Sequence, residues 1–279
     1  MIDVLLATYK SDPEWLAAQV ASIKSQRGVS VRLLQREDLH GEGPRANFDA
    51  LLQKSTAEYV AFADQDDVWM PEKLSKSLGC LQKLEKTYGV DMPIVVFTDG
   101  YVTDACLKPF PGTVISRQKI KMNTGMAFSR LLMQNFIAGC SMLFNAALRR
   151  RAGLIPQGAI FHDYWVVLVA AAFGRIGFVD EPLYLYRQHS RNTVGATSAD
   201  FAHFVRRGRE GVGAFRSRLG KNIVQAQAFV MRFGDEAPIS AAALARFDNE
   251  TAFERRLLMI RHRLFKQGFL RNIALMAFA

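Results

Sequence analysis

The first hundred residues alternate between short apolar runs and longer amphipathic segments, and this alternation constrains the fold more than any other feature of the chain. Strand-like runs are expected at residues 2–7, 29–34, 59–63 and 94–98. Helix-like segments lie between them, and the first begins at Pro13, where the missing N–H of proline costs little. Strands that alternate with helices are typical of a parallel sheet covered by helices. The sequence therefore predicts an α/β fold.

The later sequence is less regular and more basic. Further strands are expected at residues 136–144 and 176–179, with a helix beginning near His162 between them. From Asp200 onward there are 14 Lys and Arg residues against 7 Asp and Glu residues, so most of the formal net charge of +10 lies in this part. We therefore predict an α/β domain at residues 1–198 and a basic, mainly helical region at residues 199–279.

The three cysteines, Cys80, Cys106 and Cys140, have no CxxC spacing and favour a reducing cytosol over a disulfide framework or a zinc site. The N-terminus lacks the basic segment of a signal peptide, and the longest apolar run, residues 166–173, is far shorter than a membrane span requires. We expect a cytoplasmic protein, either free or bound peripherally to the inner face of the cytoplasmic membrane.

An acidic cluster, Asp64-Gln65-Asp66-Asp67, follows the third expected strand directly. In an open α/β sheet, ligands bind at this carboxyl edge of the strands. Crowded carboxylates are tolerated where a cation offsets their charge, and Mg²⁺ and Mn²⁺ prefer oxygen ligands. On the pattern alone, an acidic cap for the helix that follows explains the cluster equally well.

Several short motifs accompany this cluster in a fixed order along the chain. They are Leu5–Tyr9, Asn47 with Phe48, Asp64–Trp69 with Pro71 and Lys73, His162–Trp165, and Tyr186–His189 with Asn192. The ordered series resembles glycosyltransferase family 2, particularly its rhamnosyltransferase-like bacterial members, over roughly the first 195 residues. The resemblance implies the GT-A fold, a Rossmann-like nucleotide-sugar-binding domain that holds Mg²⁺ or Mn²⁺ on a DXD-type motif.

The resemblance also implies roles for individual residues. Asp163 would be the catalytic base, although an N-cap is its ordinary reading outside this context. The expected metal ligands are Asp66, Asp64 and His189. The expected donor-binding residues are Thr8, Tyr9, Asp38, Arg45, Asn47, Asp64 and Arg187. The sequence departs from the family around Asp38, where Arg36-Glu37-Asp38-Leu39 replaces an Asp-Asp-Gly-Ser type sequence, so the base-binding loop is expected to be reshaped.

The function expected from this resemblance is inverting transfer of a sugar. The donor would be a dTDP- or UDP-sugar, with L-rhamnose one candidate, and the acceptor a bacterial surface glycan such as O-antigen on a lipid carrier. Two alternatives remain open: a sugar nucleotidyltransferase, although the early Gly-rich phosphate loop is missing, and a basic nucleic-acid-binding module supported only by charge. The absence of a Gln-x-x-Arg-Trp sequence argues against a processive synthase. Our interpretation includes no nucleic-acid partner.

The tail contains apolar residues at helical spacing from Phe253 to Phe265, with arginines covering much of the remaining surface. This pattern predicts a basic amphipathic helix. Such a helix either lies on an anionic membrane or packs on the catalytic domain with a solvated charged face. The apolar segment at residues 269–278 would also support docking or a homodimer.

Overall fold

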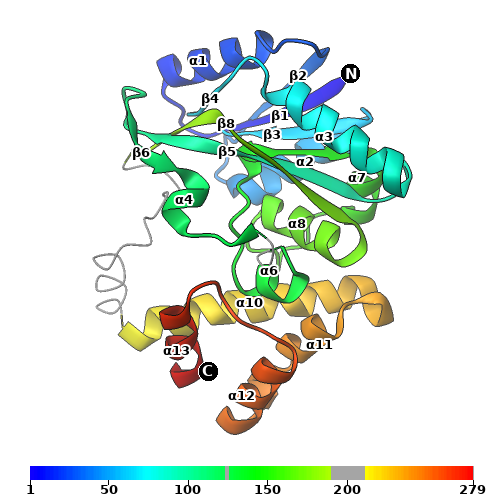
Figure 1. The fold of residues 1–279 in the computed structure, drawn as a ribbon, viewed down its shortest axis with the longest axis vertical. Coiled ribbons are helices and arrows are strands. Elements are labelled where there is room, and N and C mark those ends of the chain that lie inside the picture. The colour runs from blue at the N-terminus through cyan, green and yellow to red at the C-terminus, as the bar shows by residue number, and fades with distance from the viewer. Residues whose placement is uncertain (123–125, 190–210, 279) are drawn as a thin grey trace. The chain divides into compact units, whose positions relative to one another are not determined.

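A computed structural model of the chain describes residues 1–122, 126–189 and 211–278 (Figure 1). The chain divides into two compact units. The first combines Met1–Arg117, Ile137–Ile155 and Phe161–Ala196, and the second combines Gln118–Phe136, Pro156–Ile160 and Thr197–Ala279. The domain boundary predicted at residue 198 lies outside the described residues. The second unit also includes two segments that precede this boundary in the sequence.

The first unit contains the expected alternation of strands and helices. Its elements are β1 (Ile2–Thr8), α1 (Pro13–Lys24), β2 (Val31–Glu37), α2 (Gly43–Lys54), β3 (Tyr59–Ala63), β4 (Val68–Trp69), α3 (Lys73–Tyr88), β5 (Ile94–Thr103), β6 (Pro109–Thr113), α4 (Val114–Gln118), β7 (Met142–Asn145), α7 (Ala146–Ala152), α8 (His162–Phe173) and β8 (Arg175–Arg187). Helix α1 begins where Asp12 accepts hydrogen bonds from the N–H groups of Glu14 and Trp15.

Two strands differ from their predicted bounds. Strand β2 is shifted toward the C-terminus because it pairs with β1 from Val31 opposite Ile2 to Glu37 opposite Thr8. In the segment 136–144, only the end is extended, because a 3₁₀ turn at Gly139–Ser141 interrupts it before β7. Both differences arise from tertiary contacts that local residue patterns do not encode.

The strands form one mixed sheet in the order β2-β1-β3-β7-β5-β8-β4, with β6 paired to β5. Strands β1, β2 and β3 run parallel, as do β5 and β8, whereas β7 runs antiparallel to both β3 and β5. The sequence pattern indicated the parallel part of the sheet. The antiparallel insertion of β7 in its centre was not predicted.

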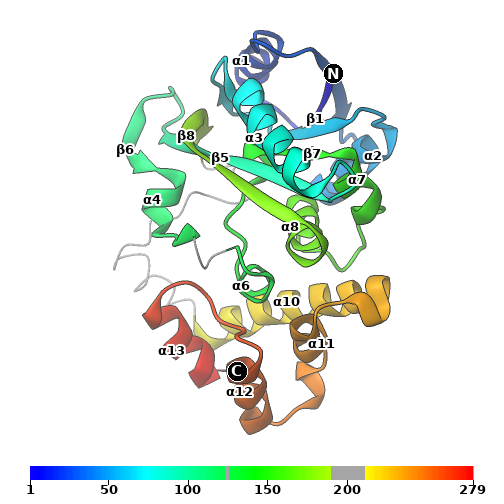
Figure 2. The same cartoon turned by 45° about the vertical axis from the view of Figure 1, so that its right-hand side comes forward.

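Helices cover both faces of this sheet, as Figures 1 and 2 show. Alternate residues of β3 point to opposite faces. Ala61 and Ala63 join one apolar cluster with residues of α1 and α3 such as Ile23 and Leu74. Phe62 faces the other way and packs against Phe48 of α2. The core therefore lies in two layers, one on each face of the sheet.

The strand directions bring several loops to one edge of the sheet. The carboxyl ends of β1, β2 and β3 coincide because these strands are parallel and in register, with Leu6 opposite Ala63. Antiparallel β7 begins at this same edge, since Phe144 pairs with Val60 and the strand starts at Met142. The loops after β1, β2 and β3 thus meet the turn that precedes β7.

The second unit is helical in its described part. Its helices are α6 (Phe128–Met133), α10 (Gly211–Phe233), α11 (Ile239–Ala245), α12 (Ala252–Arg261) and α13 (Phe269–Phe278). A capping box between Thr251 and Glu254 starts α12. The helix predicted to run to Phe265 ends at Arg261, because Arg263 adopts a left-handed backbone conformation with φ of 53°.

Among residues 1–122, 126–189 and 211–278, no helix has both the length and the apolar character needed to cross a bilayer.

Candidate active site

The acidic loop after β3 is fixed at the carboxyl edge of the sheet by amide side chains. Gln19 of α1 donates to the carbonyl oxygen of Asp64 at 2.9 Å. The Gln65 amide pairs with the backbone of Tyr9, accepting from its N–H at 2.7 Å and donating to its carbonyl at 3.1 Å. These bonds join the loop after β1 to the loop after β3, so the ends of both strands form one surface.

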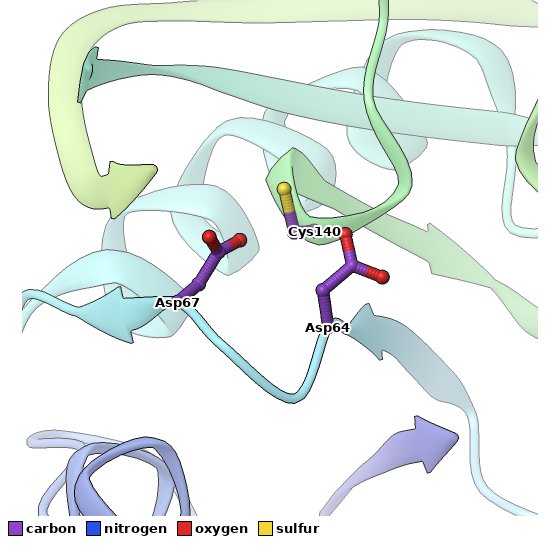
Figure 3. Close-up of side chains that lie close together, drawn as sticks. All are labelled: Asp64, Asp67 and Cys140. Carbon is purple, nitrogen blue, oxygen red and sulfur yellow. The ribbon is translucent and has the colours of Figure 1, made fainter. Parts of the chain in front are cut away.

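Asp64 and Asp67 of this loop lie close to Cys140, which precedes β7 (Figure 3). One ligand-type atom from each of Asp64, Asp67 and Cys140 lies within 4.8 Å of the others. Asp67 is fully buried, and its Oδ2 has no hydrogen-bond partner among the described residues. The unpartnered Asp67 oxygen shows that hydrogen bonds do not offset all of the negative charge of this loop. A buried cation, Lys73, lies nearby, with its ammonium 3.8 Å from the centre of the Trp69 ring.

The pKa values reflect this crowding. Burial, followed by the charges of Asp66 and Asp163, raises the pKa of Asp64 to about 7. Burial, followed by the charges of Asp66 and Asp64, also raises the pKa of Asp67 well above its ordinary value. A divalent cation would favour the ionised forms of all these groups. The carboxylates of Asp64 and Asp67 are hard oxygen donors, and the buried Oδ2 of Asp67 has no partner among the described residues, so they fit Mg²⁺ or Mn²⁺. The Cys140 thiol in the same cluster is a soft donor that these ions do not prefer.

Asp66 contacts residues at the C-terminal end of β8. Its Oδ2 lies 2.7 Å from Nε2 of His189, which follows β8. The Arg187 side chain donates from Nε to the Asp66 carbonyl at 2.8 Å, and its guanidinium lies 5.0 Å from the centre of the Trp15 ring. Trp15 also packs against the His189 ring at 4.6 Å between centroids. The predicted metal residues Asp66 and His189 are thus in direct contact, 123 residues apart in sequence.

Asp163 lies at the start of α8 and close enough to Asp64 for their charges to interact. Its Oδ2 accepts from the N–H of Gly139 at 3.0 Å, and its Oδ1 accepts from the N–H of Tyr164 at 2.7 Å. Burial raises the pKa of Asp163 to about 6, against the lowering effect of these bonds. A partly buried carboxylate with this pKa is ionised at neutral pH and basic enough to accept a proton.

His162, the neighbour of this aspartate, belongs to the core. Its ring stacks on Phe48 at 3.7 Å between centroids and meets Phe62 edge-on. Burial lowers its pKa to about 3, so the imidazole is neutral near pH 7. Its aromatic contacts fix the first turn of α8 and, with it, the position of Asp163.

The aspartate after β2 has a different environment. Asp38 Oδ1 accepts from the N–H groups of His40, Gly41 and Glu42, and Oδ2 accepts from that of Gly43. Burial acts to raise its pKa, but these four bonds outweigh burial and lower it. Both carboxylate oxygens are therefore engaged in holding the loop that leads into α2.

The remaining predicted donor residues are spread along the edge. Asn47 donates from its amide to the carbonyls of Thr8 and Arg36, and Thr8 is itself buried. Arg45 donates to the carbonyl of Ile155 at 3.2 Å. Tyr9 alone among these presents an exposed ring, 47% accessible. The structure thus joins Asp66 to Arg187 and His189, and it brings Asp64 close enough to Asp66 and Asp163 for their charges to interact. Thr8, Asp38, Arg45 and Asn47 instead have hydrogen bonds to backbone groups.

Sequence reasoning missed three contributors to this site. Cys140 was interpreted only as part of a set of three cysteines, and Gln65 was named only as part of the acidic motif. Gly139 was not singled out, yet a Cβ there would lie 3.3 Å from Cβ of Asp163 and 3.2 Å from Nε2 of His162. The Gly-Cys-Ser run just before an apolar strand was the available signal for a tight turn at this edge.

Comparison with known proteins finds a family model that matches part of the chain. Residues 18–151 match the model of "Glycosyl transferase family 2". An uncharacterized protein of Mycobacterium tuberculosis is 26% identical over 166 residues, covering 58% of this chain and 44% of the relative. The chain therefore spans less than half the length of that relative. The dTDP-rhamnosyl transferase RfbG of Shigella flexneri is 23% identical over 249 residues, covering 73% of this chain and 78% of the relative.

A solved structure shares the fold. TarS 1–349 of S. aureus in complex with UDP superposes with a TM-score of 0.52 at 14% identity, covering 94% of this chain and 87% of that one. The likeness confirms the predicted GT-A α/β fold with a helical C-terminal region. The chain is thus similar to glycosyltransferase family 2 over residues 18–151, a little less than half of its length.

Proposed function

We propose that this chain is an inverting glycosyltransferase that moves a sugar from a nucleotide-sugar donor to an acceptor hydroxyl. The observation that carries the proposal is the convergence of Asp64, Asp66 and His189 with Asp163 at the carboxyl edge of the sheet. The family match supports a transferase. We assign the chemistry to residues 1–198 and a separate, mainly helical region to residues 199–279.

The reaction proceeds in one displacement. The Asp163 carboxylate takes the proton of the acceptor hydroxyl, and the oxygen attacks the anomeric carbon from the face opposite the nucleotide. The bond between that carbon and the donor phosphate oxygen breaks, and its electron pair leaves on the nucleoside diphosphate. A single displacement inverts the anomeric centre and needs no covalent intermediate on the protein. The pKa of about 6 suits Asp163 to this proton transfer.

The charge that develops on the leaving diphosphate requires compensation. Asp64, Asp66 and His189 would hold Mg²⁺ or Mn²⁺ there, and the bound ion would act as a Lewis acid toward the phosphate oxygens. Arg187 holds the acidic loop in position, since its Nε donates to the Asp66 carbonyl and its guanidinium also donates to the Ala105 carbonyl. Its role in the proposed site is therefore to fix Asp66 as well as to add positive charge.

The donor base is proposed to lie on the exposed ring of Tyr9. Gln65 fixes the backbone of Tyr9 beside the acidic loop, which places a flat apolar surface next to the diphosphate position. Thr8, Asp38, Arg45 and Asn47 shape the rest of this edge through their backbone contacts. We propose a dTDP- or UDP-sugar as donor, because RfbG is named for dTDP-rhamnose and TarS binds UDP.

The acceptor is proposed to be a bacterial surface glycan on a lipid carrier, and L-rhamnose is one sugar that the resemblance to RfbG favours. The test is release of nucleoside diphosphate from a panel of dTDP-, UDP- and GDP-sugars, with Mn²⁺, Mg²⁺ or EDTA, in the presence of lipid-linked acceptors.

We expect metal-dependent turnover with at least one donor, which Asp163→Asn abolishes. Asp91→Asn is the matched control, because the Asp91 side chain is 93% exposed and its nearest charge partner is Arg150 at 3.5 Å. Folded protein without metal-dependent turnover across the whole panel would contradict the proposal.

A further inference from the structure

Helix α12 carries an apolar stripe that the described part of the second unit leaves exposed. Phe253, Leu257 and Ile260 recur at spacings of four and three residues, so they lie on one face of the helix. Their side chains are 74%, 53% and 57% exposed. Large apolar side chains left exposed in a contiguous group mark a surface that binds another apolar phase.

The opposite face of the same helix is already used for packing. Leu258 and Met259 are 8% and 0% exposed, and both point away from the stripe by the helical periodicity of 100° per residue. The sequence pattern joined Leu264 to the stripe, but the helix ends before it, and Leu264 is buried. Helix α12 thus has two apolar faces: one is buried in its unit, and the other is exposed in the part of the chain that the structure describes.

Helix α13 repeats this arrangement beside it. Phe269 and Ile273, four residues apart, are exposed, whereas Leu275 on the other side is buried. One hydrogen bond links the two helices, from the Arg256 side chain of α12 to the Met276 carbonyl of α13 at 2.8 Å. The exposed apolar residues of these linked helices are named here the α12–α13 surface and consist of Phe253, Leu257, Ile260, Phe269 and Ile273.

The side chains around this surface are mostly basic, which favours a negatively charged partner. Residues 251–279 contain six basic side chains and one acidic side chain, Glu254, which is engaged in the cap of α12. Arg261 and Arg263 are exposed at the end of α12. Apolar side chains that can enter the acyl boundary, next to arginines that can meet phosphates, are complementary to an anionic lipid surface.

We propose that the α12–α13 surface docks this protein on anionic membranes, with the exposed apolar side chains inserted and the neighbouring arginines on the lipid headgroups. Docking is a property of the second unit and does not depend on the transferase activity. It predicts affinity for the bilayer itself, in the absence of any glycan acceptor or nucleotide.

The experiment is sedimentation of the full chain with vesicles of phosphatidylcholine alone or of phosphatidylcholine with phosphatidylglycerol. We expect binding to the anionic vesicles, about tenfold or more weaker binding to the neutral ones, and weakening by added salt. The triple variant Phe253→Ser, Leu257→Ser, Ile260→Ser should lose most of the binding, and Arg261→Gln with Arg263→Gln should lose the preference for anionic lipid.

The matched control is Met231→Ser with Ile239→Ser, which removes two exposed apolar side chains from α10 and α11 of the same unit. It should bind vesicles as the wild type does. All variants change exposed residues, and unchanged melting temperatures would confirm that they fold.

Equal binding by the triple variant and the wild type would overturn the proposal. So would absence of vesicle binding together with a dimer, detected by sedimentation velocity, that the triple variant dissociates. That result would assign the surface to a second copy of the chain.

Discussion

The loops after β2 and β3 both carry aspartates at the same edge of the sheet, yet they use them in opposite ways. Asp38 accepts four backbone hydrogen bonds, and its pKa is lowered. Asp64 lies among other carboxylates, and its pKa is raised to about 7. The first carboxylate stabilises its loop, whereas the second adds repulsion that a bound cation would relieve. Acidity at a strand end therefore indicates a ligand site only where the protein leaves the charge uncompensated.

The largest effect on turnover is expected from Asp163, the carboxylate proposed as the catalytic base. Asp163→Asn keeps the side-chain shape and one of the two oxygens that accept from Gly139 and Tyr164, but it removes the base, so turnover should fall by about 10²–10⁴-fold. The measurement is the initial rate of nucleoside diphosphate release at saturating donor. A variant that retains more than a tenth of the wild-type rate would remove Asp163 from the proposed role.

The second effect concerns the carboxylate that contacts His189. Asp66→Asn should lower metal-supported turnover by about 100-fold, because the proposed ion would lose its main anionic ligand. Rates should be titrated with Mn²⁺ to separate weaker metal binding from slower chemistry. Wild-type metal dependence in this variant would show that Asp66 is not a ligand.

The pH dependence of turnover should follow Asp163. A base must be ionised, so the rate should be flat above pH 6 and fall about tenfold per pH unit below it. The pKa of Asp163 is about 6 in the folded protein, against an ordinary value of 3.8, so between these pH values the native state binds more protons than the unfolded state does. The contribution of Asp163 to the free energy of unfolding therefore decreases as pH rises from about 4 to about 6. Titration of Asp163 thus does not predict unfolding at pH 5. A rate that stays constant down to pH 5 would argue against this base.

The compensated aspartate should show a stability effect instead. Asp38→Ala leaves the four N–H groups of residues 40–43 without their acceptor, and the melting temperature should fall by about 2–4 °C. Differential scanning fluorimetry without ligands measures this. An unchanged melting temperature would show that water replaces the carboxylate at no cost.

The smallest effect is expected at the contact between the two loops. Gln65→Ala removes the amide that pairs with the Tyr9 backbone, so the KM for donor should rise by a factor of about 3–10 with little change in kcat. Steady-state kinetics with the donor varied would measure this split. A fall in kcat alone would place Gln65 in the chemical step.

The sequence predicted the surroundings of the acidic loop after β3 better than those of Asp38 after β2. The strand pattern located β1, β2, β3 and β5 approximately, and the resemblance brought Asp66 together with His189 and Asp163 with Asp64, although they are far apart in sequence. It could not reveal that Asp38 is fully bonded. That state depends on a tight loop in which Gly41 and Gly43 have φ of 74° and 85°.

Other features were hidden for the same reason. Cys140 enters the site because β7 runs antiparallel in the middle of the sheet, and strand direction is a property of the whole topology. The sequence pattern placed Leu264 in one stripe with Phe253, Leu257 and Ile260, but α12 ends at Arg261 and Leu264, which follows the left-handed Arg263, is buried. Local periodicity gives the elements, and tertiary pairing decides which of their side chains remain free.

The most direct test of the comparison is the shift in melting temperature that Mn²⁺ with UDP or dTDP produces in the wild type, Asp66→Asn and Asp38→Ala. A ligand at 100 times its Kd stabilises the native state by about 2.7 kcal/mol. We predict that the wild type and Asp38→Ala show this shift, Asp38→Ala from a lower starting temperature, and that Asp66→Asn starts at or above the wild-type temperature and shows no shift. A normal shift in Asp66→Asn with none in Asp38→Ala would contradict the account.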